Sequence, residues 1–361
     1  MRILILSDAN STHTKRWVSA LSKKHNIFLF SPRPLPTSDN YYSGLDNVEV
    51  CAFLPRNNKK FIDNWRYIYC IPFLKQKIKE FQPDILHSHF VSSYGVLGAL
   101  TGFHPHITSA WGSDIYIKPK KSPLHKALVK YALKNADKIL STSNIMSKEI
   151  AKYTSKDTEI TPFGVDTNLF RKIEIPKDND TFVIGNIKSL KPIYGIDILI
   201  KAYALVKANN QNLNSQLIII GDGPYKKNYA NLAASLGIAE NVNFLGALPN
   251  NTLTKHYNNF DIAVFPSISE SFGVVAIEAM ACECPVIASD ADGFTEVIIN
   301  NKTGIIVPKG NPEALAEAIQ KYIDTPTLKQ EHGTEGRKRV LELYDWEDNV
   351  RRVEEIYKSY E

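Results

Sequence analysis

Short apolar runs alternate with amphipathic segments along the whole chain. In the first half, apolar runs predict buried strands at residues 2–8, 26–32, 83–90, 106–114 and 138–143. Segments with helical spacing of apolar residues follow them, as at Trp17, Val18 and Leu21. Strands that alternate with helices predict an α/β domain with a parallel sheet.

The same alternation begins again after residue 180. Strands are predicted at 181–187, 215–224, 241–246, 261–267, 285–290 and 303–308, and helices at 195–210, 225–237, 253–260, 273–283 and 311–323. The segment between the halves, 162–180, is rich in Pro, Asp, Asn and charge, which predicts a domain boundary. We therefore expect two Rossmann-like domains that face each other across a cleft, with ligands outside the carboxyl ends of the strands.

Composition adds a charge asymmetry to this picture. The 361 residues include only four cysteines, too few for a disulfide framework, so we expect small buried side chains at Cys282 and Cys284 rather than metal ligands. Residues 1–175 carry 25 Lys and Arg against 14 Asp and Glu, whereas residues 176–361 carry 18 against 24. A basic first half indicates an anionic partner.

Two basic stretches with interleaved apolar residues, 56–81 and 118–138, account for much of this charge. They are compatible with anionic lipid headgroups or with an ordinary solvated helix face, and they contain no nucleic-acid-binding motif. No run of 18 apolar residues is present. The expectation is a cytoplasmic protein, with possible contact at the inner face of the membrane.

Two carboxylates bracket the segment "ESFGVVAIE", at Glu270 and Glu278. Ser271 is expected to cap a helix whose N-terminal N–H groups favour a phosphate, and Gly273 lets a ligand approach the backbone. Ile277 and Ala279 flank Glu278, so its charge needs a partner or a ligand. One acid then suits a sugar and the other a ribose, on either side of a diphosphate.

This segment resembles the E-x7-E element of retaining glycosyltransferases, especially glycosyltransferase family 4, which have the GT-B fold. Further similarities occur in family order at "PFGVDTNLF", "GDGP", "NVNFLG", "ADGFTEVI" and "TGIIVP", and at the last helix "YDWEDNVRRVEEIYKSY", which in the family crosses back onto the N-terminal domain. The implied domains are 1–172 with 345–361, which binds the acceptor, and 180–344, which binds the nucleotide-sugar donor.

The resemblance also implies roles for single residues. Glu278 would bind the ribose and Glu270 the donor sugar, while the diphosphate would meet Lys188, Lys191 and the residues from Ser271 through Phe272 and Gly273 to Val274. Gly221, Gly246 and Leu248 would lie near the nucleotide, with base contacts made largely by backbone. The sequence departs from the family at "GNIKSLKPIYG", which has lysines and no arginine, and at "SDANSTHTKRW", which has no glycine.

In the first half, "HSHF" and "SAWGSD" match the family's cleft-edge segments. His89 would contact the donor sugar or the acceptor hydroxyl, whereas His87 is expected to be structural. Asp114 would either orient the acceptor hydroxyl or cap the next segment. His13 is a further candidate for acceptor or phosphate contact.

The implied function is a retaining glycosyltransferase that uses a nucleotide-diphosphate sugar, needs no metal or other cofactor, and transfers to a lipid-linked saccharide acceptor in capsule or O-antigen assembly. Two alternatives stay open: a sugar-nucleotide epimerase of the same fold, and a nucleotide-sugar-binding subunit without catalysis.

Overall fold

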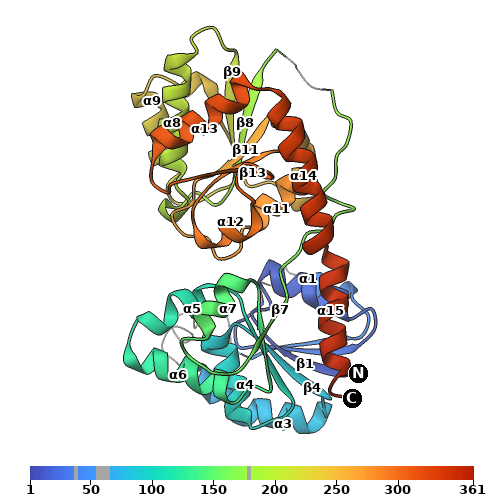
Figure 1. The fold of residues 1–361 in the computed structure, drawn as a ribbon. Coiled ribbons are helices and arrows are strands. Elements are labelled where there is room, and N and C mark those ends of the chain that lie inside the picture. Colours follow the sequence, from blue (N-terminus) through green and yellow to red (C-terminus); the bar gives the residue numbers. More distant parts are fainter. Residues whose placement is uncertain (36–39, 54–65, 177–179) are drawn as a thin grey trace. The chain divides into compact units, whose positions relative to one another are not determined.

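The computed structural model describes residues 1–35, 40–53, 66–176 and 180–361. It consists of two compact units (Figure 1), and each has its own parallel sheet. Unit 1 comprises Met1–Pro162 and Asp348–Glu361, and unit 2 comprises Phe163–Glu347. The predicted α/β class with two Rossmann-like domains is confirmed.

Seven strands form the sheet of unit 1, in the order β3-β2-β1-β4-β5-β6-β7. They are β1 (Arg2–Leu6), β2 (Asn26–Ser31), β3 (Val48–Ala52), β4 (Ile85–His89), β5 (His106–Ala110), β6 (Lys138–Ser141) and β7 (Thr158–Ile160). All five predicted strands are present. The sequence pattern missed β3 and β7, because both are edge strands with little buried apolar surface.

The helices of unit 1 bury apolar side chains against this sheet. They are α1 (Thr12–Leu21), α3 (Ile71–Phe81), α4 (Val96–Thr101), α5 (Ser113–Tyr116), α6 (Pro123–Lys134) and α7 (Asn144–Ile150), with short turns η1 (Tyr41–Gly44), η2 (Arg66–Cys70), η3 (Val91–Gly95) and η4 (Lys118–Lys120).

The last helix, α15 (Trp346–Lys358), ends in unit 1, as predicted for the final segment. Its inner face is fixed by polar contacts, one of them buried. The Tyr357 hydroxyl lies 2.5 Å from Nδ1 of His87, and Lys24 Nζ donates to Glu354 at 2.8 Å. The His87 ring also bonds Ser109 at 2.8 Å, so His87 has the structural role that was expected.

Six strands form the sheet of unit 2, in the order β10-β9-β8-β11-β12-β13. They are β8 (Phe182–Ile187), β9 (Ser215–Ile220), β10 (Val242–Gly246), β11 (Ile262–Phe265), β12 (Val286–Ser289) and β13 (Gly304–Val307). Each matches a predicted strand. All neighbouring pairs are parallel, so the carboxyl ends of the six strands meet at one edge.

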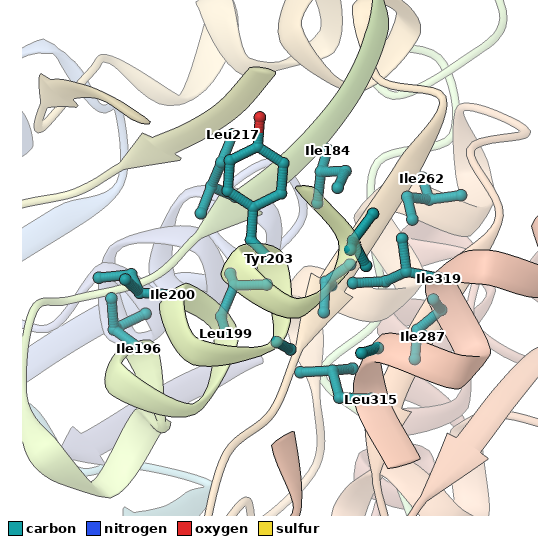
Figure 2. Packing of buried hydrophobic residues seen from close by; sticks show 14 of the residues in the cluster. Ile184, Ile196, Leu199, Ile200, Tyr203, Leu217, Ile262, Ile287, Leu315 and Ile319 are labelled. Atoms are coloured by element: carbon teal, nitrogen blue, oxygen red, sulfur yellow. The ribbon is translucent and has the colours of Figure 1, made fainter. Parts of the chain in front are cut away.

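The helices of unit 2 are α8 (Ile196–Asn209), α9 (Lys226–Ser235), α10 (Leu253–Asn259), α11 (Val274–Ala281), α12 (Asp292–Val297), α13 (Pro312–Asp324) and α14 (Thr327–Leu343), with turns η5 (Pro192–Tyr194), η6 (Ala239–Asn241) and η7 (Asn250–Thr252). Figure 2 shows the core between the sheet and helices α8 and α13, where Leu199, Tyr203 and Ile319 pack against strand residues such as Ile184 and Ile262. Within this core the Tyr203 hydroxyl donates to the Ser215 carbonyl at 2.8 Å.

The start of the predicted linker packs within unit 2. The Phe163 ring lies 5.9 Å from that of Phe272, and the Phe170 ring lies 6.0 Å from that of Tyr257. Val165 pairs with Asp345 in an isolated bridge. Apolar residues inside a charged segment anchor it to the second unit, and unit 1 therefore ends at Pro162.

Candidate functional site

The strand order brings the predicted residues of unit 2 to one point of the sheet edge. In this order, β8 and β11 are neighbours whose chain connections run in opposite directions, which makes the crevice between their carboxyl ends the usual ligand site of such sheets. Lys188 directly follows β8, and Glu270 lies in the loop after β11. The two residues are thus brought to the same crevice from 82 positions apart.

Lys188 and Glu270 form an ion pair there. The Nζ atom lies 2.6 Å from Oε2, and the side chains are 13% and 11% exposed. The ammonium group also lies 4.8 Å from the centre of the Tyr194 ring, within range of a cation–π interaction. A pair this well shielded from water interacts more strongly than a surface pair, and it fixes the Lys188 ammonium group at the crevice.

Two glycines fix the backbone beside Lys188. Gly221 has φ +140°, and a Cβ there would lie 2.0 Å from the Lys188 carbonyl oxygen, so only glycine fits. The Gly221 N–H donates to the carbonyl of Gly246 at 2.8 Å, which joins the ends of β9 and β10. Both predicted glycines therefore line the same strand edge as Lys188.

The expected cap at Ser271 is wrong. Helix α11 starts at Val274, and its N-cap is Gly273, with φ +97° and no side-chain cap hydrogen bond. A Cβ at Gly273 would lie 2.7 Å from the Phe294 ring, so the tight turn before the helix requires glycine. The Ser271 N–H instead bonds the Glu270 carboxylate at 3.2 Å.

The other predicted site residues of unit 2 divide between the core and the surface. The Phe272 side chain is 2% exposed and packs between Phe163 and Tyr344, so only its backbone can face a ligand. Val274 is half-buried at the first turn of α11. Lys191 is exposed just before η5, and Leu248 is half-buried beyond β10.

Glu278 is a buried carboxylate on α11. It is 9% exposed, and the hydroxyl of Tyr257 donates to its Oε2 at 3.0 Å. Tyr257 lies on α10 and is fully buried. The sequence indicated that Glu278 needs a partner, but it gave no signal for Tyr257, which is 21 positions away.

Unit 1 contains a cavity of about 340 Å³ at the carboxyl edge of its own sheet. It lies at the corresponding switch point, between β1 and β4, and its lining comes from the loops after β1, β2, β4 and β5 and from η3, η4 and α6. Its lining residues include Ser7, Asp8, Arg33, His89, Ser92, Ser93, Trp111, Lys118 and His125.

His89 is 1% exposed and lies among neutral groups in this cavity. Its Nδ1 lies 3.2 Å from the Ser7 hydroxyl, and its ring is 4.5 Å from that of Trp111. Burial, together with His87 and His13, holds the pKa of His89 well below its usual range. His89 is therefore an uncharged imidazole at neutral pH, able to exchange hydrogen bonds with a hydroxyl group.

Asp114 lies behind the cavity and has no exposed surface. Its carboxylate accepts from the backbone N–H groups of Val91 and Gly112, both at 2.8 Å, and of Trp111 at 3.2 Å. Burial nevertheless raises the pKa of Asp114 to about 6. These contacts favour the capping alternative over direct contact with a ligand.

The turn that Asp114 holds is strained. Phe90 has φ +80°, a conformation that a bulky side chain rarely adopts, and the π-helical turn η3 follows it. This turn supplies Ser92 and Ser93 to the cavity. Asp114 thereby ties the ends of β4 and β5 into one wall.

Sequence reasoning missed part of the cavity lining. Arg33 pairs with Asp8 at 3.1 Å, and Ser92 and Ser93 come from η3. None of them belongs to a recognisable motif; their only signal is that each follows a predicted strand. His13 lies beside Trp111, with ring centres 5.8 Å apart, and burial lowers the pKa of His13 to about 4.

The remaining predictions concern cysteines and basic segments. Cys282 and Cys284 are buried, 1% and 3% exposed, and burial raises the pKa of Cys282. Residues 56–65 of the first basic stretch lie outside the described part of the chain. The second stretch forms η4 and α6; Leu124 and Tyr131 on α6, and Ile117 just before η4, are exposed near lysines. No described helix is long and apolar enough to cross a membrane.

Comparison with known proteins matches both halves of the chain to glycosyltransferase families. Residues 2–143 match the family model "Glycosyl transferase 4-like", and residues 167–339 match "Glycosyl transferases group 1". An uncharacterized glycosyltransferase of Methanocaldococcus jannaschii, MJ1178, is 29% identical over 76% of this chain and 75% of its own. The capsular polysaccharide biosynthesis glycosyltransferase CapM of Staphylococcus aureus is 31% identical over 62% of each chain.

The structure of Anabaena HepE in complex with UDP superposes with a TM-score of 0.79 at 19% identity, covering 99% of this chain and all of that one. At this identity the similarity shows the fold alone. The fold is that of the GT-B glycosyltransferases, in which two Rossmann-like domains follow one another.

Proposed function

This chain belongs to the glycosyltransferase family defined by the group 1 and 4-like models, and on that premise we propose that it is a retaining, metal-independent transferase. It moves a sugar from a nucleotide-diphosphate sugar to a saccharide acceptor that is linked to a lipid, in cell-surface polysaccharide assembly. The observation that carries this proposal is the largely shielded ion pair of Lys188 and Glu270 at the switch point of unit 2.

Unit 2 binds the donor in this proposal. Lys188 and the backbone N–H groups at the start of α11 neutralise the diphosphate, Glu278 accepts hydrogen bonds from the ribose hydroxyls, and Glu270 meets the donor sugar. Lys188 already supplies a shielded positive charge at this point, and that is the reason for proposing that no metal is required. The UDP complex of HepE supports UDP as the first nucleotide to test.

The reaction exchanges one bond for another at the anomeric carbon. The bond from this carbon to the diphosphate oxygen breaks, and the bond to the acceptor oxygen forms on the same face. The leaving phosphate oxygen accepts the proton of the acceptor hydroxyl. Lys188 and the helix N–H groups act where negative charge develops on the leaving group, which is the interaction that lowers the barrier.

Unit 1 binds the acceptor in its cavity. Trp111 offers an aromatic face, and Ser92 and Ser93 offer hydroxyl groups, a combination that suits a sugar ring. His89 is neutral and can orient the acceptor hydroxyl by a hydrogen bond without competing for its proton as a strong base. Asp114 holds this wall in place from behind.

A lipid-linked acceptor is supported by the surface next to the cavity. Lys118 and His125 line the cavity, and each is preceded by an exposed apolar residue, Ile117 at 45% and Leu124 at 62%. Exposed lysines of η4 and α6 surround them, so this corner combines apolar and cationic groups as a membrane-surface site does. The similarity to CapM points to the same class of pathway.

The test is calorimetric binding of UDP, GDP and ADP, each with and without EDTA, followed by turnover with the corresponding sugar donors. We expect one nucleotide to bind at micromolar Kd without sensitivity to EDTA, and NMR of the product to show retention at the anomeric carbon. Conversion of the nucleotide sugar into its epimer, without release of the nucleoside diphosphate, would indicate an epimerase instead. Binding without any turnover across an acceptor panel would indicate a binding subunit.

A further inference from the structure

Glu278 is a carboxylate in a buried, apolar segment of α11. Its neighbours Ile277 and Ala279 are fully buried, and Glu278 itself is 9% exposed. A carboxylate in such surroundings is costly unless donors reach it. Tyr257 provides such a donor through its hydroxyl, 3.0 Å from Oε2.

Tyr257 is itself held rigidly. Its ring is fully buried and makes edge contacts with Phe170 and Phe260, with centres 6.0 and 6.1 Å apart. Burial and the adjacent Glu278 keep the pKa of Tyr257 well above its usual range. The hydroxyl therefore stays protonated, and so remains a donor, over the whole range in which enzymes work.

The helix that carries Tyr257 is anchored by side-chain hydrogen bonds to the segment that follows unit 1. Asn258 binds the carbonyl of Arg171 and the N–H of Ile173, both at 2.9 Å, and Thr254 donates to the carbonyl of Leu169 at 2.9 Å. Residues 169–173 thus fix α10, and α10 fixes the hydroxyl that Glu278 accepts from.

From these contacts we infer that Tyr257 is a positioning residue, which sets the orientation of the Glu278 carboxylate for the ribose of the donor. This inference rests on the proposed function, in which Glu278 binds the ribose hydroxyls. Each carboxylate oxygen can accept two hydrogen bonds, and the Tyr257 hydroxyl supplies one of them at Oε2. Tyr257 limits how the carboxylate can rotate and thereby pre-organises it for a diol.

The test compares Tyr257→Phe with Tyr203→Phe. Tyr203 is a matched control because it is also a fully buried tyrosine of unit 2, with its hydroxyl bound to the Ser215 carbonyl in the core on α8. Binding of UDP, GDP and ADP and of their 2′-deoxy forms is measured by calorimetry for wild type and both variants. The ratio of ribo to 2′-deoxy affinity reports on the ribose contact, which a general loss of stability does not change.

We expect Tyr257→Phe to weaken binding of the preferred ribonucleotide about tenfold and the 2′-deoxy form less, while Tyr203→Phe leaves both unchanged. An unchanged ratio in Tyr257→Phe, or an equal shift in Tyr203→Phe, would overturn the inference. If the wild type binds none of the three nucleotides, the proposed function itself is wrong. This outcome is distinct from failure of the inference, which is seen only in the variants.

A double-mutant cycle gives a second test. In a Glu278→Ala background, Tyr257→Phe removes no bond to a carboxylate, so its effect on nucleotide affinity should vanish. Additive losses would show that Tyr257 acts independently of Glu278. This cycle needs only that the Glu278→Ala protein folds, and it decides the question if Tyr257→Phe alone does not.

Discussion

The two sheets share a strand order but carry different chemistry at the same topological point. In unit 2, the crevice between β8 and β11 holds a largely shielded ion pair, Lys188 with Glu270, beside the start of a helix. In unit 1, the crevice between β1 and β4 opens into a cavity with His89, hydroxyl groups and an indole ring, and its ion pair, Arg33 with Asp8, is more exposed.

This difference separates what topology decides from what side chains decide. The strand order selects where a ligand can lie, because only there do the loops of adjacent strands diverge. The side chains of the loops then select the kind of ligand. An ammonium group beside the N–H groups of a helix start suits a diphosphate, and hydroxyl groups beside an aromatic surface suit a sugar.

The largest effect is expected from removing the charge of unit 2. Lys188→Ala should lower kcat/KM about 10²–10³-fold, because a pre-organised cation at the leaving group is lost. Lys201→Ala, an exposed lysine on α8, is the control and should leave kcat/KM unchanged. Steady-state kinetics with the preferred donor measure both.

Loss of Lys188 also leaves the Glu270 carboxylate buried without its cation, which lowers stability. The double variant Lys188→Met/Glu270→Leu separates the two effects. Because apolar groups replace both charges, its free energy of unfolding should be higher than that of Lys188→Ala. It should nevertheless stay inactive. Recovery of activity in this variant would mean that the pair is structural only.

A smaller but clear effect is expected at the wall of the unit 1 cavity. Asp114→Asn replaces one acceptor oxygen by an NH₂ group, so at least one of the backbone N–H groups of Val91, Gly112 or Trp111 loses its partner. The free energy of unfolding should fall by about 2 kcal/mol. Asp46→Asn, at an exposed site, should change it by less than about 0.5 kcal/mol.

If Asp114 acts by holding η3, the variant should raise KM for the acceptor more than KM for the donor. Equal changes in both would contradict the assignment of the cavity to the acceptor. Denaturant unfolding and two-substrate kinetics provide the two readings.

Acid should lower the stability of unit 1 through its buried histidines. Burial lowers the pKa of His87 to about 3, of His106 to about 4 and of His89 well below its usual range, and all three lie in unit 1. Below pH 6.5 the unfolded chain binds protons at these sites and the folded unit does not. The stability they contribute is therefore present above pH 6.5 and is lost as the pH falls from 6.5 toward 4.

His87 and His106 should each lower the free energy of unfolding by about 2 kcal/mol between pH 7 and pH 5, and His89 should lower it in the same direction. Asp114 acts in the opposite sense, because its raised pKa of about 6 favours the folded state on acidification. Urea unfolding at pH 7 and pH 5 measures the sum. His87→Gln should flatten the dependence, and an unchanged slope would contradict the role of His87.

Much of this arrangement could be predicted from the sequence. The positions of Lys188 and Glu270 follow from strand ends, because parallel strands bring residues after each strand to a shared edge. The helix containing Glu278 follows from its apolar run. These predictions depend on local pattern and on topology, which the sequence carries directly.

Other features depend on contacts that no local pattern encodes. Tyr257 reaches Glu278 through the packing of α10 on α11, and Arg33 reaches Asp8 across two loops. The cap at Ser271 was wrong because the left-handed turn at Gly273 delays the start of the helix. The domain boundary similarly depended on where Phe163 and Phe170 pack.

The smallest effect per substituted residue is expected at the membrane-facing corner proposed for unit 1. Lys121, Lys126 and Lys130 are exposed on and next to α6. Replacing all three by Gln should weaken binding to phosphatidylserine-containing vesicles by about 1 kcal/mol for each cation, or roughly fivefold each, with the loss largest at low salt. Vesicle sedimentation measures the partition coefficient.

The charge-matched control replaces three exposed lysines of unit 2, Lys226, Lys227 and Lys255, by Gln. It changes the net charge equally, so a purely global attraction would be weakened as much. Local docking predicts a loss only in the α6 variant. Equal losses would show that the basic half attracts membranes through its overall field, and the lipid-linked acceptor would then lose its structural support.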